Sequence, residues 1–210
     1  MPSFGCFVFD FDGTLIDSNQ LKMSAFFELA AEIDGGSEAM MKVQLDQVGD
    51  RFMAWEAWAK ALGRSQEYGQ MMAMRYSERV DELVISAPEM LGARALLDYL
   101  HFSNKRMVLS SATPYTSLVH IIQRRGLDKY FSDVFGSPMT KLDVLVNKVI
   151  PTVGHPDLVA VIGDGPDDRD SAIRAKCHFF PVGERGRATG KENTPTYSLP
   201  QLKALFQAAG

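Results

Sequence analysis

The chain has 210 residues, which is enough for one well-packed core and a smaller second domain. Hydrophobic residues make up 46% and charged residues 23% of the sequence, a globular composition that excludes a disordered chain. The formal net charge of -4 and the lack of a basic run disfavour nucleic-acid binding. No run of about 18 apolar residues occurs and the start has no signal-peptide pattern, so we expect no membrane span and a cytoplasmic location.

Short apolar runs of strand length recur along the chain and alternate, in its later part, with helical patterns. The runs lie at residues 6–9, 106–109, 133–135, 158–162 and 178–182, and the helical patterns at 114–125, 142–149, 168–175 and 200–208. Strands that alternate with helices are typical of βαβ units. We therefore predict an α/β fold with a doubly wound, Rossmann-like parallel sheet. Cys6 and Cys177 lack metal-ligand spacing and are predicted to be free thiols.

The interval from residue 16 to residue 86 differs from the rest because it contains helical patterns and no convincing strand. Its helical stretches lie at 18–33, 37–48, 52–62 and 65–84. We interpret it as an inserted helical domain, with the α/β core formed by residues 1–15 and 87–210. Trp55 and Trp58 share a helical face and are predicted to be core, as are the methionines of this insertion. Pro88 is predicted to open a helix that returns to the core.

Two aspartates directly follow the first predicted strand, in the segment Asp-Phe-Asp-Gly-Thr. Asp10 and Asp12 repel each other unless a cation compensates their charges, and one of them could then act as a nucleophile. The alternative is a simple turn, because Asp-Gly is common in turns.

A second acidic segment, Gly-Asp-Gly-Pro-Asp-Asp, follows the fourth predicted strand. In a doubly wound sheet the carboxyl ends of neighbouring strands meet, so we expect Asp10, Asp12, Asp164 and Asp168 to converge. A site built from carboxylate oxygens suits Mg²⁺. Alternatively, Asp167 or Asp168 caps the following helix; Asp168 is able to do both, and Asp167 is expected to be exposed or capping.

Asp-x-Asp-Gly-Thr at one strand end, followed by Gly-Asp-x-x-x-Asp at another, resembles the haloacid dehalogenase superfamily. The resemblance covers nearly the whole chain, and the place of the insertion is similar to that in members with a helical cap, such as phosphoglycolate phosphatase and β-phosphoglucomutase. It implies that Asp10 is the nucleophile and that Asp12 is the general acid and base. It also implies that Mg²⁺ is held by Asp10, the Asp12 carbonyl and Asp164, with Asp168 ligating or orienting.

The same resemblance assigns roles to smaller elements. Ser110, with Ser111 as the register alternative, corresponds to the phosphate-binding hydroxyl, although such clusters before helices are mostly caps. Thr14 is expected to contact phosphate or to stabilise the turn. Lys141 falls where the family has a lysine that balances the carboxylates. Relatives usually have proline after this lysine, whereas Leu142 follows here, so the orientation of the lysine does not follow from the resemblance.

In the insertion, Arg51 lies in a segment that resembles a substrate-facing cap loop. Arg51 is expected either to bind a carboxylate or second phosphate of the substrate, or to be a surface arginine or one that pairs with Glu56, and the sequence favours neither. The mutase branch typically has histidine where this chain has Lys22, which favours hydrolysis.

The sequence therefore predicts a Mg²⁺-dependent phosphatase acting on a small-molecule phosphate monoester through an aspartyl-phosphate. A phosphoglycolate-like acid, a sugar phosphate and a nucleotide all remain open as substrates. The alternatives are a phosphomutase of the β-phosphoglucomutase type and a non-catalytic module that binds a metabolite or protein. No nucleic-acid or membrane partner is expected, and the oligomeric state is open.

Overall fold

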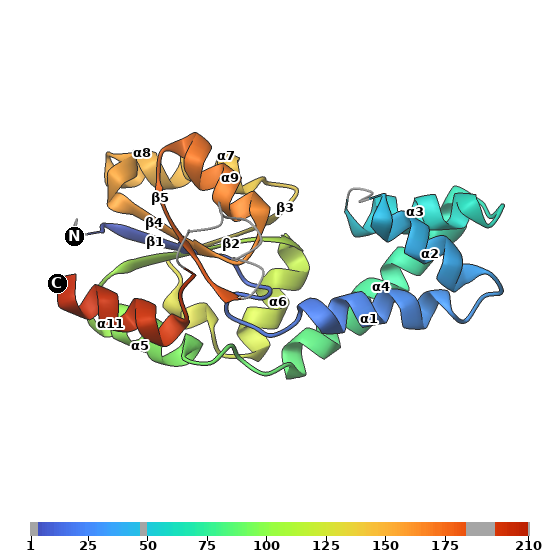
Figure 1. Cartoon of the computed structure of the whole chain (residues 1–210), viewed down its shortest axis with the longest axis horizontal. Coiled ribbons are helices and arrows are strands. Elements are labelled where there is room, and N and C mark those ends of the chain that lie inside the picture. Colours follow the sequence, from blue (N-terminus) through green and yellow to red (C-terminus); the bar gives the residue numbers. More distant parts are fainter. Residues whose placement is uncertain (1–3, 47–49, 184–195, 210) are drawn as a thin grey trace. The chain divides into compact units, whose positions relative to one another are not determined.

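The chain divides into two compact units. A computed structural model describes residues 4–46, 50–183 and 196–209 (Figure 1). One unit comprises Met1–Asp17 and Ala87–Gly210, and the other is the continuous segment Ser18–Ser86. None of the helices in the described ranges is both long and apolar enough to cross a membrane.

The first unit is built on a five-stranded parallel sheet with the strand order β3-β2-β1-β4-β5. Phe9 of the central strand is level with Leu109 on one side and Ile162 on the other. β2 and β3 follow one another on one side of β1, and β4 and β5 follow on the other side. The direction in which successive strands are added therefore reverses next to β1, as in a doubly wound sheet. The predicted fold class is therefore confirmed. The strands are β1 Cys6–Phe9, β2 Arg106–Pro114, β3 Asp133–Ser137, β4 Val159–Gly163 and β5 His178–Pro181.

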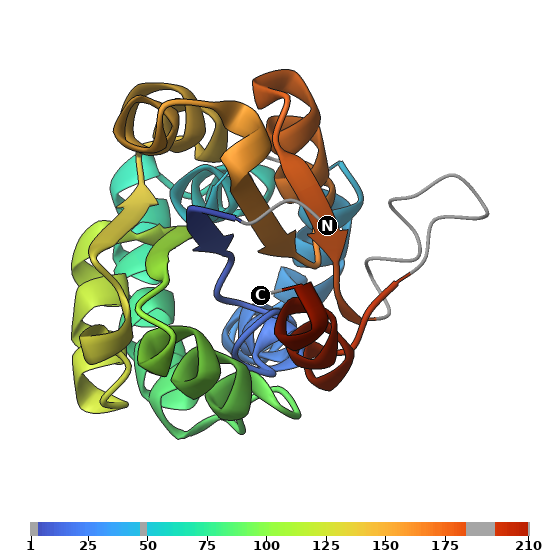
Figure 2. The ribbon, with the colours of Figure 1, turned by 90° about the vertical axis from the view of Figure 1, so that its left-hand side faces the viewer.

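Helices cover both faces of this sheet, as Figures 1 and 2 show. One face carries α5 (Ala93–Phe102), α6 (Tyr115–Arg124) and α11 (Leu199–Ala209), and the other carries α7 (Lys141–Val144), η2 (Leu145–Val149), α8 (Ile150–Val153) and α9 (Pro166–Ala175). The short 3₁₀ turns η1 (Asp128–Tyr130) and η3 (Pro156–Leu158) complete the connections. The predicted helix 142–149 thus extends further than expected, and its middle is a π-helix just before Pro151. Proline has no N–H for the regular helical bond, which is a physical reason for the wider turn there.

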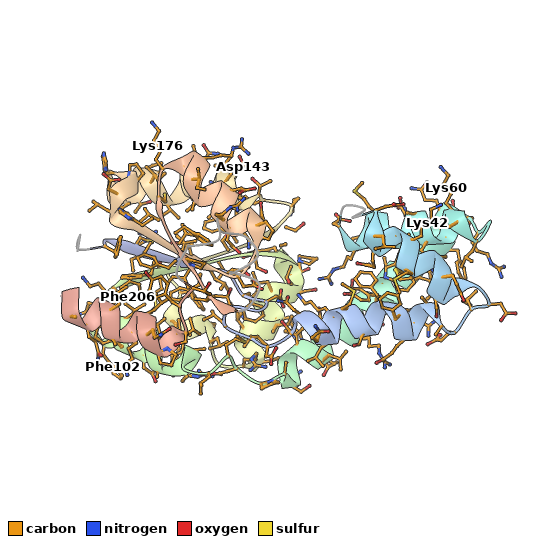
Figure 3. All side chains as sticks on the ribbon, viewed as in Figure 1. Lys42, Lys60, Phe102, Asp143, Lys176 and Phe206 are labelled. Atoms are coloured by element: carbon orange, nitrogen blue, oxygen red, sulfur yellow. The ribbon has the colours of Figure 1, made fainter. Side chains whose placement is uncertain are left out.

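The two faces of the sheet have cores of different composition. Aliphatic side chains such as Val8, Val108 and Val161 form a cluster on the α7–α9 side. On the opposite side, Phe7 packs edge-on against Phe206 of α11, with 5.0 Å between ring centroids. Phe206 points toward the sheet, whereas the 82% exposed Phe102 points away from it (Figure 3). The alternation of Phe7 and Val8 along β1 therefore supplies both cores from one strand.

The prediction that Pro88 opens a helix is wrong. Asp17 donates its N–H to the Pro88 carbonyl at 3.0 Å, Met90 donates to the Leu15 carbonyl at 2.9 Å, and Ile16 forms an antiparallel bridge with Glu89. This pairing holds the backbone extended, and α5 begins at Ala93 instead. It also places Ile16 and Asp17 with the α/β unit, two residues beyond the expected boundary.

In its described residues, the second unit consists of four helices: α1 Asn19–Ala30, α2 Gly36–Leu45, α3 Arg51–Ala61 and α4 Gln66–Ser86. Trp55 and Trp58 are fully buried, which confirms their predicted place in the core, and Trp58 donates its indole N–H to the Gly36 carbonyl at 2.8 Å. Phe26 stacks on Tyr76 with 3.9 Å between ring centroids. This aromatic cluster is the centre of the helical unit.

The methionine prediction holds for only part of the set. Met40 and Met72 are fully buried, but their helix neighbours Met41 and Met71 are 52% and 44% exposed. Met53 and Met74 are also exposed. Successive residues on a helix point about 100° apart, so adjacent methionines do not both face one core.

Close packing of α3 against α4 depends on Gly69. A Cβ at this position would lie 2.8 Å from the Glu56 Cα and 2.9 Å from the Trp55 carbonyl oxygen, and both are backbone atoms of α3. The helices therefore approach more closely than alanine allows.

We predict that Gly69→Ala lowers the free energy of unfolding by about 1–3 kcal/mol, because the forced separation of the helices outweighs the better helix propensity of alanine. Urea unfolding measures the change. Met74→Ala, an exposed substitution on the same helix, is the control and should stay within about 0.5 kcal/mol of wild type. Equal effects of the two substitutions would contradict the packing role.

Both cysteines are free thiols, as predicted. Burial raises the pKa of Cys6 to about 12 and that of Cys177 to about 11. We predict that at pH 8 a thiol reagent modifies the native protein at least about 100-fold more slowly than the urea-unfolded protein, because the reactive thiolate is scarce in the fold. The absorbance of the group that a chromogenic thiol reagent releases measures the rate, and fast labelling of either native thiol would refute the prediction.

Candidate active site

The segment after β1 forms a tight turn that leaves two carboxylates at the carboxyl edge of the sheet. Asp10 donates its N–H to the Ile162 carbonyl of β4 at 2.9 Å, so it continues the sheet. The chain then turns at Gly13, whose φ of 77° is a left-handed conformation that favours glycine, and Gly13 donates to the Ile16 carbonyl at 2.7 Å. The expected alternative, a turn, is thus present together with the acidic site.

Three carboxylates from two segments meet at this edge. Oxygens of Asp10, Asp164 and Asp168 all lie within 4.8 Å of one another, and the three residues are buried. Asp164 directly follows β4, and Asp168 lies in the first turn of α9. Of the four aspartates that the sequence predicts to converge, these three form the group, whereas the Asp12 carboxylate is not part of it and accepts a hydrogen bond from Thr113. Such a group is strongly repulsive unless positive charge compensates it.

Lys141 supplies part of that compensation. Its Nζ lies 2.8 Å from Asp10 Oδ1 and 2.6 Å from Asp168 Oδ1, and only 12% of its side chain is exposed. Burial acts to lower the pKa of Lys141, but the two carboxylates outweigh it and the pKa is raised, so the side chain stays an ammonium. Lys141 thus contacts both aspartates although it is followed by Leu142 and not by the proline that is usual in the family.

Asp168 is held by its surroundings as well as by Lys141. Its Oδ2 accepts the N–H of Gly165 at 3.1 Å, which caps α9, while Asp167 is exposed. A Cβ on Gly163 would lie 2.2 Å from the Asp168 Cγ, so the carboxylate folds back over a position that only glycine leaves open. Burial, and then repulsion from Asp10, raises the pKa of Asp168 to about 7 against the lowering effect of Lys141.

The donor set fits a hard divalent cation. All three side chains offer oxygen, and Mg²⁺ prefers oxygen ligands. When ionised, the three carboxylates exceed the charge of Lys141 by two units, which is the charge of one divalent cation. The residues present are therefore suitable for Mg²⁺.

The predicted hydroxyl residues lie at the same edge of the sheet. Thr14 donates to Asp10 Oδ2 over a long 3.5 Å, and Ser110 lines a small cavity together with Asp10, Lys141 and Asp168. Ser111 instead accepts the N–H of Thr113 at 3.1 Å within the tip of β2. Of the two register alternatives, Ser110 is the one that shares a cavity with Asp10.

Two polar residues near the carboxylates were not singled out from the sequence. Thr113 donates its hydroxyl to Asp12 Oδ2 at 2.9 Å, and Ser171 of α9 lines the small cavity beside Ser110. The signal for Thr113 was its place in the same hydroxyl-rich segment as Ser110 and Ser111. No sequence signal identified Ser171.

Arg51 and Lys22 belong to the helical unit. Arg51 donates to Ser77 Oγ at 3.3 Å and lies over the Tyr76 ring, 5.6 Å from its centroid. Glu56, the expected alternative partner, accepts hydrogen bonds from Gln66 and Gln70. The carbonyl of Lys22 accepts the Tyr76 hydroxyl at 3.2 Å. Residues 48 and 49 of the expected cap loop lie outside the described residues.

We predict that Lys141→Met lowers the free energy of unfolding by about 3–5 kcal/mol at pH 8 without metal, because two buried carboxylates lose their cation. Urea unfolding measures this change. The folded-state pKa of Asp168 lies above its unfolded value, so protonation favours the folded state at low pH and this contribution is lost as pH rises through about 7. The deficit of the variant should therefore be smaller at pH 5 than at pH 8.

Lys148→Met, which removes an exposed lysine of η2, is the matched control for this charge. It should change the free energy of unfolding by no more than about 0.5 kcal/mol at either pH. A pH-independent deficit in Lys141→Met would contradict an electrostatic origin.

Comparison with known proteins places this geometry in a family. The family model for haloacid dehalogenase-like hydrolases matches residues 4–176. Among curated protein sequences, none matches the chain significantly.

Solved structures with a similar fold include both phosphatases and mutases. A proposed β-phosphoglucomutase from Thermotoga maritima is 19% identical, with a TM-score of 0.75 over 99% of this chain and 100% of its own. The β-phosphoglucomutase of Clostridium difficile is 18% identical, with a TM-score of 0.72 over 98% and 96%. A predicted phosphoglycolate phosphatase from Haemophilus somnus is 15% identical, with a TM-score of 0.67 over 87% and 86%. At these identities the likeness shows the fold alone. The family model spans most of the sequence, including every residue of the carboxylate–lysine site, and the chain belongs to the haloacid dehalogenase-like hydrolases.

Proposed function

We propose that the protein is a Mg²⁺-dependent phosphatase that hydrolyses a small-molecule phosphate monoester through an aspartyl-phosphate on Asp10. The observation that carries this proposal is the contact of Asp10 with Lys141 at 2.8 Å, inside a cluster of buried carboxylates suited to a divalent cation. A carboxylate held between positive charges can accept a dianionic phosphate nearby and still attack it. Membership of a hydrolase family supports the same reading.

In the first step an Asp10 oxygen attacks phosphorus, and the bond from phosphorus to the leaving oxygen breaks. The leaving oxygen keeps the electron pair and takes a proton from the Asp12 carboxyl group, so an alcohol departs. In the second step a water oxygen attacks the phosphoryl group while Asp12 takes the water proton. The bond from phosphorus to Asp10 then breaks, which restores the carboxylate and releases inorganic phosphate.

The remaining residues of the site orient and neutralise the phosphate. Lys141 balances the charge of the phosphoryl group, and Ser110 and Thr14 donate to its oxygens. Asp10, Asp164 and Asp168, with the carbonyl of Asp12, would hold Mg²⁺, which would supply further neutralisation of negative charge.

We assign substrate selection to the helical unit, acting as a cap. Arg51 begins α3, where its guanidinium donates to Ser77 Oγ and lies over the Tyr76 ring, and we propose that it binds a carboxylate or a second phosphate of the substrate. The substrate classes in this proposal are a phosphoglycolate-like acid, a sugar phosphate and a nucleotide. The partner is a small molecule, with no nucleic acid and no membrane.

A phosphomutase is the second candidate, because β-phosphoglucomutases are among the proteins of similar fold. It would share the first step and then return the phosphoryl group to a sugar hydroxyl. Lys22, where the mutase branch typically has histidine, favours hydrolysis.

We predict that the wild-type protein hydrolyses at least one member of a panel of phosphate esters, including p-nitrophenyl phosphate, only when Mg²⁺ is present. Asp10→Asn should reduce turnover by about 1,000-fold or more, because the nucleophile is lost. Phosphate release measures turnover, and acid-quenched protein from a radiolabelled ester should carry label in wild type and not in Asp10→Asn.

Asp167→Asn, an exposed aspartate next to the site, is the matched control and should keep wild-type turnover. No hydrolysis of any ester would reject the phosphatase proposal. Sugar phosphate isomerisation that requires a bisphosphate primer would establish the mutase instead.

A further inference from the structure

We propose that Thr113 is a positioning residue for Asp12, whose carboxyl group it holds in the orientation that transfers a proton to the leaving oxygen. This inference rests on the proposed function, in which Asp12 is the general acid and base. It adds a residue to that reaction and separates two tasks, attack by Asp10 and proton transfer by Asp12.

The contact joins the tips of two neighbouring strands. Thr113 lies near the end of β2 and donates its hydroxyl to Asp12 Oδ2 at 2.9 Å, while Asp12 lies in the turn after β1. Thr113 is only 3% exposed, so the bond is shielded from water on one side. A hydrogen bond from a hydroxyl to an ionised carboxylate is stronger than one between neutral groups. It therefore restricts rotation of the Asp12 carboxyl group.

The threonine is itself held in place from two sides. Its N–H donates to Ser111 Oγ at 3.1 Å. On the other side, a Cβ on Gly136 of β3 would lie 2.6 Å from the Thr113 carbonyl oxygen, so this glycine allows a close approach of the two backbones. Threonine is also β-branched, which restricts its own side-chain rotation. The hydroxyl that contacts Asp12 thus comes from a rigid part of the site.

The two catalytic carboxylates have different hydrogen-bond donors. Lys141 and Thr14 contact Asp10, whereas Thr113 contacts Asp12. Loss of the Thr113 hydroxyl should consequently impair proton transfer and leave nucleophilic attack almost unchanged. An alkyl ester needs its leaving oxygen protonated, but p-nitrophenolate is a weak base that leaves without a proton.

The experiment compares kcat/KM for p-nitrophenyl phosphate with kcat/KM for the alkyl ester of the panel that wild type hydrolyses fastest. Each kcat/KM value reflects only the steps up to release of the first product, so the later hydrolysis of the aspartyl-phosphate does not affect it. Thr113→Val removes the hydroxyl with little change of shape, and Thr113→Ser keeps it. Thr152→Val, the same change at an exposed helical position in α8, is the matched control.

For Thr113→Val we expect kcat/KM to fall about 100-fold for the alkyl ester and less than about threefold for p-nitrophenyl phosphate. Thr113→Ser should recover most of the alkyl-ester activity, and Thr152→Val should match wild type on both esters. An equal loss on both esters would overturn the inference and make Thr113 a substrate contact or a purely structural residue. No turnover by wild type would instead reject the proposed function, and the inference with it.

Discussion

The site depends on one electrostatic constraint: several carboxylates are buried together and must not remain uncompensated. Asp10, Asp164 and Asp168 share a few ångströms of space, with Lys141 between two of them. Removing such groups from water is costly, and repulsion adds to that cost. The arrangement is therefore stable only with compensating positive charge, and that charge is also what a phosphoryl group requires. The positive charge that stabilises the buried carboxylates would thus be the same charge that binds a phosphoryl group.

The parallel sheet meets this constraint because it brings strand ends to one edge. Asp10 follows β1, Asp164 follows β4, and Lys141 begins the helix after β3. The backbone makes room at specific points. Gly163 lets Asp168 fold back into the cluster, and Gly136 lets the tip of β2 approach β3. Each glycine acts by the absence of a Cβ at a close contact.

Expectations from sequence failed where a contact between distant segments decided the conformation. Pro88 is a good first residue for a helix, yet pairing of residues 88–90 with residues 15–17 holds this segment extended. The methionines of the insertion are apolar, but Met40 and Met72 are fully buried whereas Met41, Met53, Met71 and Met74 are exposed. Local propensity and side-chain type do not show which distant segment will pack against a residue. Both errors arise because this tertiary contact is not visible in the sequence.

The sequence by itself determined the fold class and the acidic residues and lysine of the candidate site, but not Thr113 or Ser171. Alternating strand and helix patterns are local properties, and acidic residues at strand ends converge in any doubly wound sheet. Only the tertiary structure decided how those residues are paired. It places the Thr113 hydroxyl on Asp12, Ser110 rather than Ser111 in the cavity beside Asp10, and Lys141 between Asp10 and Asp168. These choices depend on strand register and on the path of each turn, and they arise from packing between segments that are far apart in the sequence, such as Asp12 with Thr113 and Asp10 with Lys141.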